Sequence, residues 1–202
     1  LSEWKDTEYF SQKELYGTDF YGPSLELIQA LQLHRGNAIQ VVQGNQAAVA
    51  PMAAAASRVD AVLQALQALE SKHSAHFTRG ELLNDITRSW QTLKADVRSM
   101  PPADGFAAHT RIVEQVLGYI EWFSDQFNLT LDPEVDTFYL MQLASFTLPR
   151  AIEFSARLRG QAAGAVAGGD INAATLKKLL SSKPIAVDKV DDAVRSAIKA
   201  ND

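Results

Sequence analysis

The stretch that decides the fold is "LDPEVDTFYLMQLASFTLPRAIEFSARLRG", residues 131–160. Asp132 is a good helix N-cap, because its carboxylate can accept hydrogen bonds from the free amides of the first turn. Pro133 fits the first helical position, where no amide proton is needed. The dense apolar face that follows predicts one long helix over about residues 133–167. Pro149 is expected to bend this helix in its middle, since proline removes an intrahelical hydrogen bond.

The rest of the chain shows the same helical period. Apolar residues recur at three- and four-residue spacing, as at Ile86, Trp90 and Leu93, and no window alternates strictly enough to predict a strand. "MPPADG", residues 100–105, is the clearest loop, and "AGGD", residues 167–170, should end the quoted helix with glycines. The pattern predicts helices over about residues 2–43, 46–76, 79–99, 106–127 and 133–167, followed by one or two short ones.

Helices of about 20 to 40 residues joined by short loops are typical of an antiparallel bundle. At about 1.5 Å per residue, the longest would span roughly 50–60 Å, which makes a rod. The expected fold class is therefore all-α, an elongated antiparallel helical bundle of the four-helix-bundle type.

A short echo links the first and the last long helix. "RGNAIQVVQGN", residues 35–45, and "RGQAAGAVAGG", residues 159–169, both read R-G-x-A-x-x-x-V-x-G. Each copy lies toward the end of a long helix and runs into a glycine stop. The echo favours two stacked sub-modules, about residues 1–100 and 101–202, within one domain of residues 1–202.

Composition excludes several classes of protein. The 202 residues are 47% hydrophobic and 21% charged, which suits a folded domain with a sizeable core. The net charge of −5, without a concentrated basic patch, argues against a nucleic-acid partner. The absence of cysteine excludes disulfides, thiolate catalysis and cysteine-ligated metals. Since the sequence contains no P-loop, G-x-S-x-G, H-E-x-x-H or dinucleotide fingerprint, we expect no catalytic activity in this chain.

The chain is expected to be a fragment of a longer protein. It begins at Leu1 and contains no run of about 18 or more apolar residues, so no transmembrane helix is expected inside it. Any flanking transmembrane helices would lie outside this sequence.

Arg35 and Arg159 are the candidate ligand-binding residues that the echo singles out. Each is followed by a glycine, which lets two helices approach closely. A guanidinium at such a groove can grip an anion with two parallel hydrogen bonds. The alternative for both arginines is an interhelical salt bridge, or simple solvation at the surface.

His34 and Tyr139 complete the candidate groove. His34 lies seven residues from both Leu27 and Val41, so it faces the core with them. It is either a satisfied inward histidine or a ligand-binding or proton-sensing group. Tyr139 is one of several aromatic residues at helical spacing along the quoted stretch; such residues are usually core, but one could wall a small pocket.

No metal and no cofactor are expected. His73 and His76 are spaced as i and i+3 near a helix end, a spacing that can chelate a metal. No further cluster of histidine, aspartate or glutamate accompanies them. Cationic side chains at a helix C-terminus explain the pair more simply.

The quoted stretch also resembles a known family. "LTLDPEVDTFYLMQLASFTLPRAIEFSARLRGQAAGA" is similar to the pattern "L-x-L-D-P-x-x-x-[ST]-[FY]-Y-L-M", followed by "L-P" and "R-G", of extracytoplasmic sensor regions in bacterial transmembrane signalling proteins. "LQLHRGNA", residues 31–38, resembles the first-helix "HRG" element of these regions. The family includes sensor histidine kinases, methyl-accepting chemotaxis receptors and diguanylate cyclases. The likeness covers about residues 20–170 and implies an all-helical domain between two transmembrane helices that passes a displacement across the membrane.

We therefore expect a periplasmic sensing domain of a membrane-bound sensor histidine kinase, in which binding displaces the membrane-connected helices. A chemotaxis receptor or a diguanylate cyclase is the alternative output. An alternative of another class is a structural helical bundle that only mediates protein contacts. The expected partners are an unknown small-molecule ligand or a periplasmic protein, and a second copy of the chain in a homodimer of the parent protein, whose kinase module lies outside this chain.

Overall fold

The computed structural model describes residues 2–76, 80–129 and 135–167, and the single residues 169, 174, 177, 191, 194, 195 and 198. Its elements in chain order are α1 (Ser2–Val42), η1 (Gln46–Ala48), α2 (Val49–Lys72), α3 (Leu82–Asp96), η2 (Val97–Ser99), α4 (Pro102–Gln126), α5 (Val135–Gln142), η3 (Leu143–Thr147) and α6 (Leu148–Ala167). Elements η1 and η2 are short 3₁₀ turns, whereas η3 is a π-helical turn. The described residues form no strand, which confirms the predicted all-α fold.

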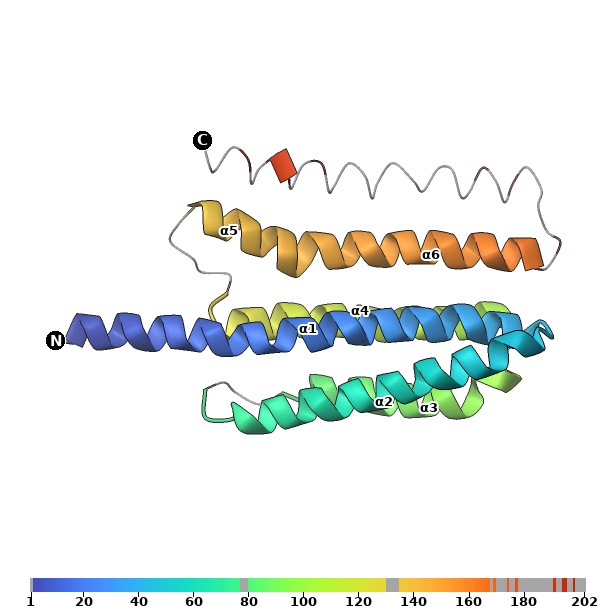
Figure 1. The fold of residues 1–202 in the computed structure, drawn as a ribbon, viewed down its shortest axis with the longest axis horizontal. Helices are drawn as coiled ribbons and strands as arrows, with labels where there is room; N and C mark the ends of the chain where they lie inside the picture. Colours follow the sequence, from blue (N-terminus) through green and yellow to red (C-terminus); the bar gives the residue numbers. More distant parts are fainter. Residues whose placement is uncertain are drawn as a thin grey trace.

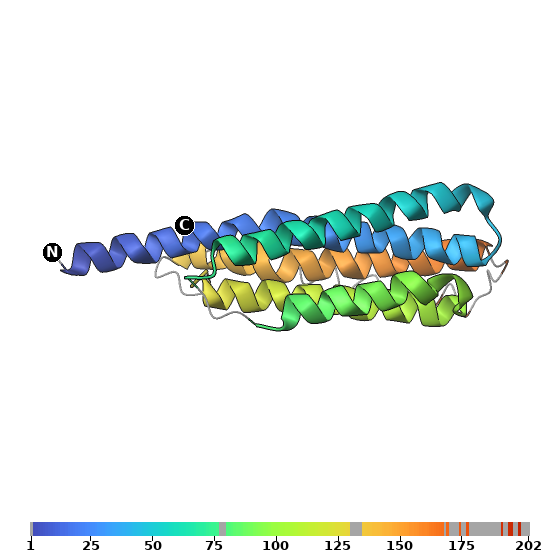
Figure 2. The same cartoon turned by 90° about the horizontal axis from the view of Figure 1, so that it is seen from below.

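The helices lie side by side in an elongated bundle, in which each long segment runs antiparallel to the one before it (Figure 1, Figure 2). Helix α1 is the central element, since it packs against α2, α4 and α6. It runs parallel to α6, because Tyr21 contacts Ser145 just before α6 and Ile39 lies beside Gly164 near the end of α6. The two copies of the sequence echo therefore lie on neighbouring parallel helices. The division into two sub-modules stays a prediction.

The core lies between the apolar faces of α1, α2, α3 and α4. Trp90 of α3 is fully buried, and its indole Nε1 donates a hydrogen bond of 2.8 Å to Asp60 Oδ1 on α2. Farther toward the start of α1, the ring of Phe20 packs against Phe123 and Phe127, at centroid distances of 5.5 and 5.4 Å. Such buried rings contribute a large apolar area each and hold the helices in register.

Helix α1 approaches the end of α4 closely at Gly17. A Cβ atom added at this position would lie 2.6 Å from Phe127 Cβ and 2.8 Å from Leu129 Cδ1. We expect Gly17→Ala to lower the free energy of unfolding by about 1–3 kcal/mol, because both contacts force the helices apart. Urea unfolding followed by circular dichroism measures the change. Gly22→Ala, where nothing lies within 4 Å of the added Cβ, is the matched control, and equal stability of the two variants would contradict this prediction.

The predicted loop over residues 100–105 is mostly helix, which corrects the expected start of the fourth helix at residue 106. Helix α4 begins at Pro102, directly after Pro101 as its N-cap residue. Proline is tolerated in the first turn, where its missing amide proton has no intrahelical acceptor. Asp104, also in the first turn, suits the positive end of the helix dipole. The "PP" pair therefore starts this helix and does not extend the loop.

Pro149 is accommodated by the π-helical turn η3. The amide of Leu148 donates to the carbonyl oxygen of Leu143, five residues back. The next residue, Pro149, has no amide proton and so interrupts the series of helical hydrogen bonds. Figure 1 shows that the segment changes direction between α5 and α6, close to the predicted bend. The predicted cap at Asp132 and Pro133 and the predicted short helices after residue 170 lie outside the described residues.

Candidate functional site

The structure places two of the four predicted site residues in the bundle interior and two outside it. His34 and Arg35 of α1 are both 1% exposed. Arg159 of α6 is exposed, and Tyr139 of α5 is half-buried beside the ring of Phe138. Tyr139 precedes the part of α6 that faces Arg35 by roughly 20 Å of helix. The structure therefore brings Arg35, His34 and Arg159 to one region of the bundle and leaves Tyr139 apart from them.

Arg35 forms a buried ion pair with Glu153 of α6. Its Nη1 lies 2.7 Å from Glu153 Oε1 and its Nη2 lies 3.3 Å from Oε2, so two hydrogen bonds join the guanidinium to the carboxylate. Nη1 also donates to Thr110 Oγ1 on α4 at 3.0 Å, and Cζ lies 4.8 Å from the ring centroid of Phe106. Arg35 thus makes the interhelical salt bridge that the sequence left open as an alternative.

The carboxylate of Glu153 accepts hydrogen bonds from two side chains of α1 and one of α6. Besides the two bonds from Arg35, Oε2 accepts from Gln32 Nε2 at 2.9 Å and Oε1 accepts from Arg157 Nε at 2.8 Å. Arg157 also pairs with Glu114 on α4. Glu153 is only 2% exposed, so its charge depends on these donors for compensation. The carboxylate connects α6 to α1 directly and to α4 through Arg157.

His34 faces α3 and α4, where its Nδ1 lies 2.7 Å from His109 Nε2. His109 Nδ1 lies 2.6 Å from the carbonyl oxygen of Gly105, which can only accept, so Nδ1 carries a proton and Nε2 accepts from His34. Burial lowers the pKa of His34 to about 4 and the pKa of His109 to about 3. Both imidazoles are therefore neutral near pH 7, and His34 is a hydrogen-bonded inward histidine.

An open groove of about 520 Å³ borders the Arg35–Glu153 pair. It is lined by Gly22, Leu25, Glu26, Ile28, Gln29, Gln32, Leu33, Arg58, Pro149, Ile152 and Arg159. Gln32 belongs to both regions, since it lines the groove and donates to Glu153. Within the part of the chain that the structure describes, no acidic side chain pairs with Arg159, whereas Arg58 pairs with Glu26 at 2.9 Å. The groove therefore offers one cationic side chain without an acidic partner among the described residues, Arg159, and one side chain, Gln32, that contacts the buried pair.

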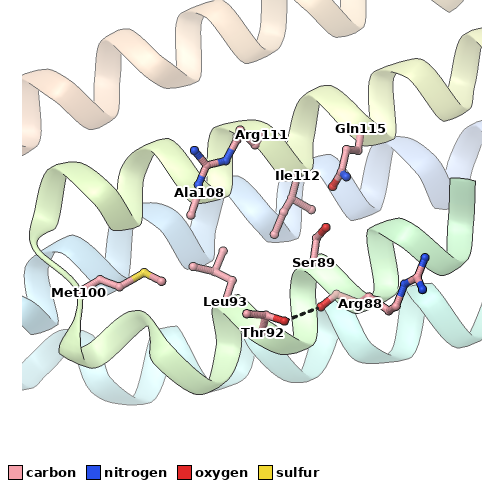
Figure 3. Close-up of a pocket in the computed structure, with 9 residues that line it drawn as sticks. All are labelled: Arg88, Ser89, Thr92, Leu93, Met100, Ala108, Arg111, Ile112 and Gln115. Carbon is pink, nitrogen blue, oxygen red and sulfur yellow. Dashed lines mark hydrogen bonds between the residues drawn. The ribbon is translucent and has the colours of Figure 1, made fainter.

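A second groove, of about 410 Å³, lies between α3 and α4 (Figure 3). Apolar side chains such as Leu93 and Ile112 point into it, and Arg111 lies on its α4 side (Figure 3). No ion pair joins Arg111 to any of the described residues. No buried arginine lines this groove, so an anion there would be held only by exposed side chains.

The histidines that raised the question of a metal site have other contacts. His73 Nε2 lies 3.1 Å from Asp19 Oδ2 on α1, and its ring packs 4.7 Å from the ring of Tyr16. The ring of His76 also packs on Tyr16, at 4.6 Å, and lies 6.5 Å from the ring of His73. Among the residues that the structure describes, no three histidine, aspartate or glutamate side chains are grouped as a metal site would require.

Four residues of this region were not predicted from the sequence: Glu153, Gln32, Thr110 and His109. One signal for Glu153 was available. On α6 its neighbours one turn away are Pro149, Arg150, Ala156 and Arg157, so the sequence indicates a carboxylate paired with arginine on this face, although not that the carboxylate is buried. No comparable signal marks Gln32 or Thr110, because neutral polar residues on helix faces are common.

Comparison with known proteins gives one match. The family model described as nitrate and nitrite sensing matches residues 26–197, which include Arg35, Glu153 and the groove residue Arg159. No curated protein and no solved structure matches the chain. None of the described helices is both long enough and apolar enough to cross a membrane.

Proposed function

The chain belongs to the nitrate and nitrite sensing family, which supplies extracytoplasmic sensor domains to bacterial signalling proteins, and we propose that it binds nitrate or nitrite between α1 and α6. The observation that supports this site is the buried guanidinium of Arg35 next to an open groove whose rim carries Arg159. A planar oxyanion suits an arginine, because two of its oxygens accept the parallel N–H donors of the fork. Gln32 offers a further donor from the shared wall of the groove.

Arg159 is proposed as the residue that an anion meets first. It is exposed on α6, lines the groove and forms no ion pair with another described residue, so an anion can approach it without displacing a carboxylate. Arg35 is proposed as the buried residue that binds the anion. The imidazole of His34 faces away from this pair, toward α3 and α4, and we assign it a structural role in the core.

The test is binding of sodium nitrate and sodium nitrite to the purified domain, by calorimetry and by thermal shift, with sodium chloride at equal ionic strength as the reference. An anion at about 100 times its dissociation constant should stabilise the fold by about 2.7 kcal/mol. Arg159→Ala is expected to weaken binding roughly tenfold, because a hydrogen bond to a charged group contributes about 1.5–3 kcal/mol.

Arg111→Ala is the matched control, since it removes another exposed arginine that lines a groove (Figure 3). It should leave the affinity unchanged. Absence of nitrate and nitrite binding to the wild-type domain would overturn the proposed function. A loss of affinity in Arg111→Ala but not in Arg159→Ala would instead place the anion in the α3–α4 groove.

We further propose that this domain is the periplasmic part of a membrane-bound sensor histidine kinase, and that it acts by binding and displacement of helices and not by catalysis. Membership in an extracytoplasmic sensor family supports this assignment. In the full-length parent protein in membranes, nitrate should change the rate of autophosphorylation, and a nitrate response of methyl-accepting or cyclase output would favour the alternatives. Cross-linking of the parent protein tests the proposed homodimer.

A further inference from the structure

The carboxylate of Glu153 occupies the face of Arg35 that an oxyanion ligand would use. Both oxygens of Glu153 face the Nη atoms of Arg35, at 2.7 and 3.3 Å. Carboxylate, nitrite and nitrate share a planar centre with two oxygens that can accept from one arginine fork. The donors that hold Glu153 are therefore suited to the proposed ligand as well.

We propose that Glu153 is an internal carboxylate that competes with nitrate or nitrite for Arg35, so that the ligand binds by displacing it. This inference rests on the proposed function and names the residue that sets the affinity and selectivity of the same site. The buried fork is not free in the structure, because Glu153 and Arg35 are 2% and 1% exposed and fully engaged with each other. An anion must therefore offer Arg35 better hydrogen bonds than a tethered carboxylate does.

The route to the pair leads through Gln32. This side chain lines the groove of about 520 Å³ and donates to Glu153 Oε2 at 2.9 Å. Rotation of one amide group therefore opens the pair to the groove and leaves the amide protons of Gln32 available to the incoming anion. Chloride is spherical and cannot use the two arms of the fork as a planar oxyanion does, so the exchange favours nitrate and nitrite.

Arg157 provides a second partner for the displaced carboxylate. It lies one turn after Glu153 on α6, donates to Oε1 at 2.8 Å and also pairs with Glu114 on α4. A carboxylate that leaves Arg35 can stay bound to Arg157 on the α4 side. Exchange therefore removes the direct bond between α1 and α6 while the contact of α6 with α4 remains, which is a displacement of the kind that a sensor transmits.

Glu153→Gln is the direct test, with nitrate affinity measured by calorimetry at constant pH and ionic strength. The amide keeps the shape of the side chain but removes the competing charge, so nitrate affinity should rise at least about tenfold. The melting temperature should fall in nitrate-free buffer and recover in nitrate more than that of the wild type does. A purely structural Glu153 would lower the melting temperature without raising the affinity.

Two further variants keep the test decisive. Glu153→Asp retains the charge on a shorter arm that cannot reach both Arg35 and Gln32, and it should raise nitrate affinity by roughly threefold or more; it replaces Glu153→Gln if that variant does not fold. Glu121→Gln removes a surface carboxylate that pairs with Arg150 and takes no part in the Arg35–Glu153 network, and it should leave the affinity unchanged. Wild-type binding with equal or weaker affinity in the Glu153 variants overturns this inference alone, whereas absence of wild-type binding overturns the proposed function.

Discussion

Arg35→Ala is expected to lower the free energy of unfolding by about 3–5 kcal/mol in nitrate-free buffer, because it leaves the carboxylate of Glu153 buried without its main cation. Gln32 and Arg157 remain as donors to Glu153, but the side chain of Arg157 is 30% exposed and shared with Glu114. Neither can replace the fork of a fully buried guanidinium. Urea unfolding of the wild type and the variant, followed by circular dichroism, gives the difference.

The double variant Arg35→Leu with Glu153→Leu separates the lost charge compensation from the lost packing. It should regain most of the stability, since apolar replacement of a whole buried pair is often neutral or stabilising. Arg58→Ala is the surface control, because its pair with Glu26 is 52% and 42% exposed and should contribute less than about 1 kcal/mol. A loss in Arg35→Ala no larger than in Arg58→Ala would show that Glu153 finds adequate compensation without Arg35.

The candidate site follows from the sequence only in part. The echo singled out Arg35 and Arg159, which the structure places on the neighbouring helices α1 and α6, but it gave no reason to expect that only Arg35 would be buried. An added Cβ at Gly36 would meet nothing within 4 Å, whereas at Gly160 it would lie 3.1 Å from Phe106 Cε2. The motif therefore fixes the local helix, while the partner of each arginine depends on how α1, α4 and α6 are set against one another. That register is a property of packing between distant segments, which no single sequence window contains.

The fold follows from the sequence more closely than the site does. Among the described residues, apolar spacing located each of the long helices, since a buried face repeats with the helical period wherever a helix packs on a core. The glycine stops after α1 and α6 are confirmed, because Gly44 and Gly169 adopt φ values of +93° and +70°, which favour glycine. The π-helical turn was not predicted. Its residue Ser145 bonds to Tyr21 of α1, which also bonds to Ser124 of α4, so tertiary contacts and Pro149 together select it.

Acidification from about pH 7 to about pH 5 is expected to lower the free energy of unfolding by about 3–4 kcal/mol through His34 and His109. In the unfolded chain both titrate near their ordinary pKa of 6.5, whereas burial holds the folded pKa at about 4 for His34 and about 3 for His109. Lys94 lowers the pKa of His34 further, and Asp60 opposes it. Between these values the unfolded chain binds more protons, so stability falls as the pH falls. Urea unfolding at a series of pH values measures the slope, about 1.4 kcal/mol per pH unit for each histidine.

The variant that carries both His34→Gln and His109→Gln isolates this contribution. Its amides keep a donor and an acceptor in the core but do not titrate, so its stability should change much less between about pH 5 and pH 7, even if it is lower overall. For His109 the hydrogen-bond directions act together with burial against protonation. His109 already donates from Nδ1 to Gly105. A proton on its Nε2 would face the Nδ1 proton of His34, because these two nitrogens are 2.7 Å apart. A wild-type domain that is equally stable at both pH values would mean that the pair takes up protons without unfolding, and that one imidazole turns away to make room for them.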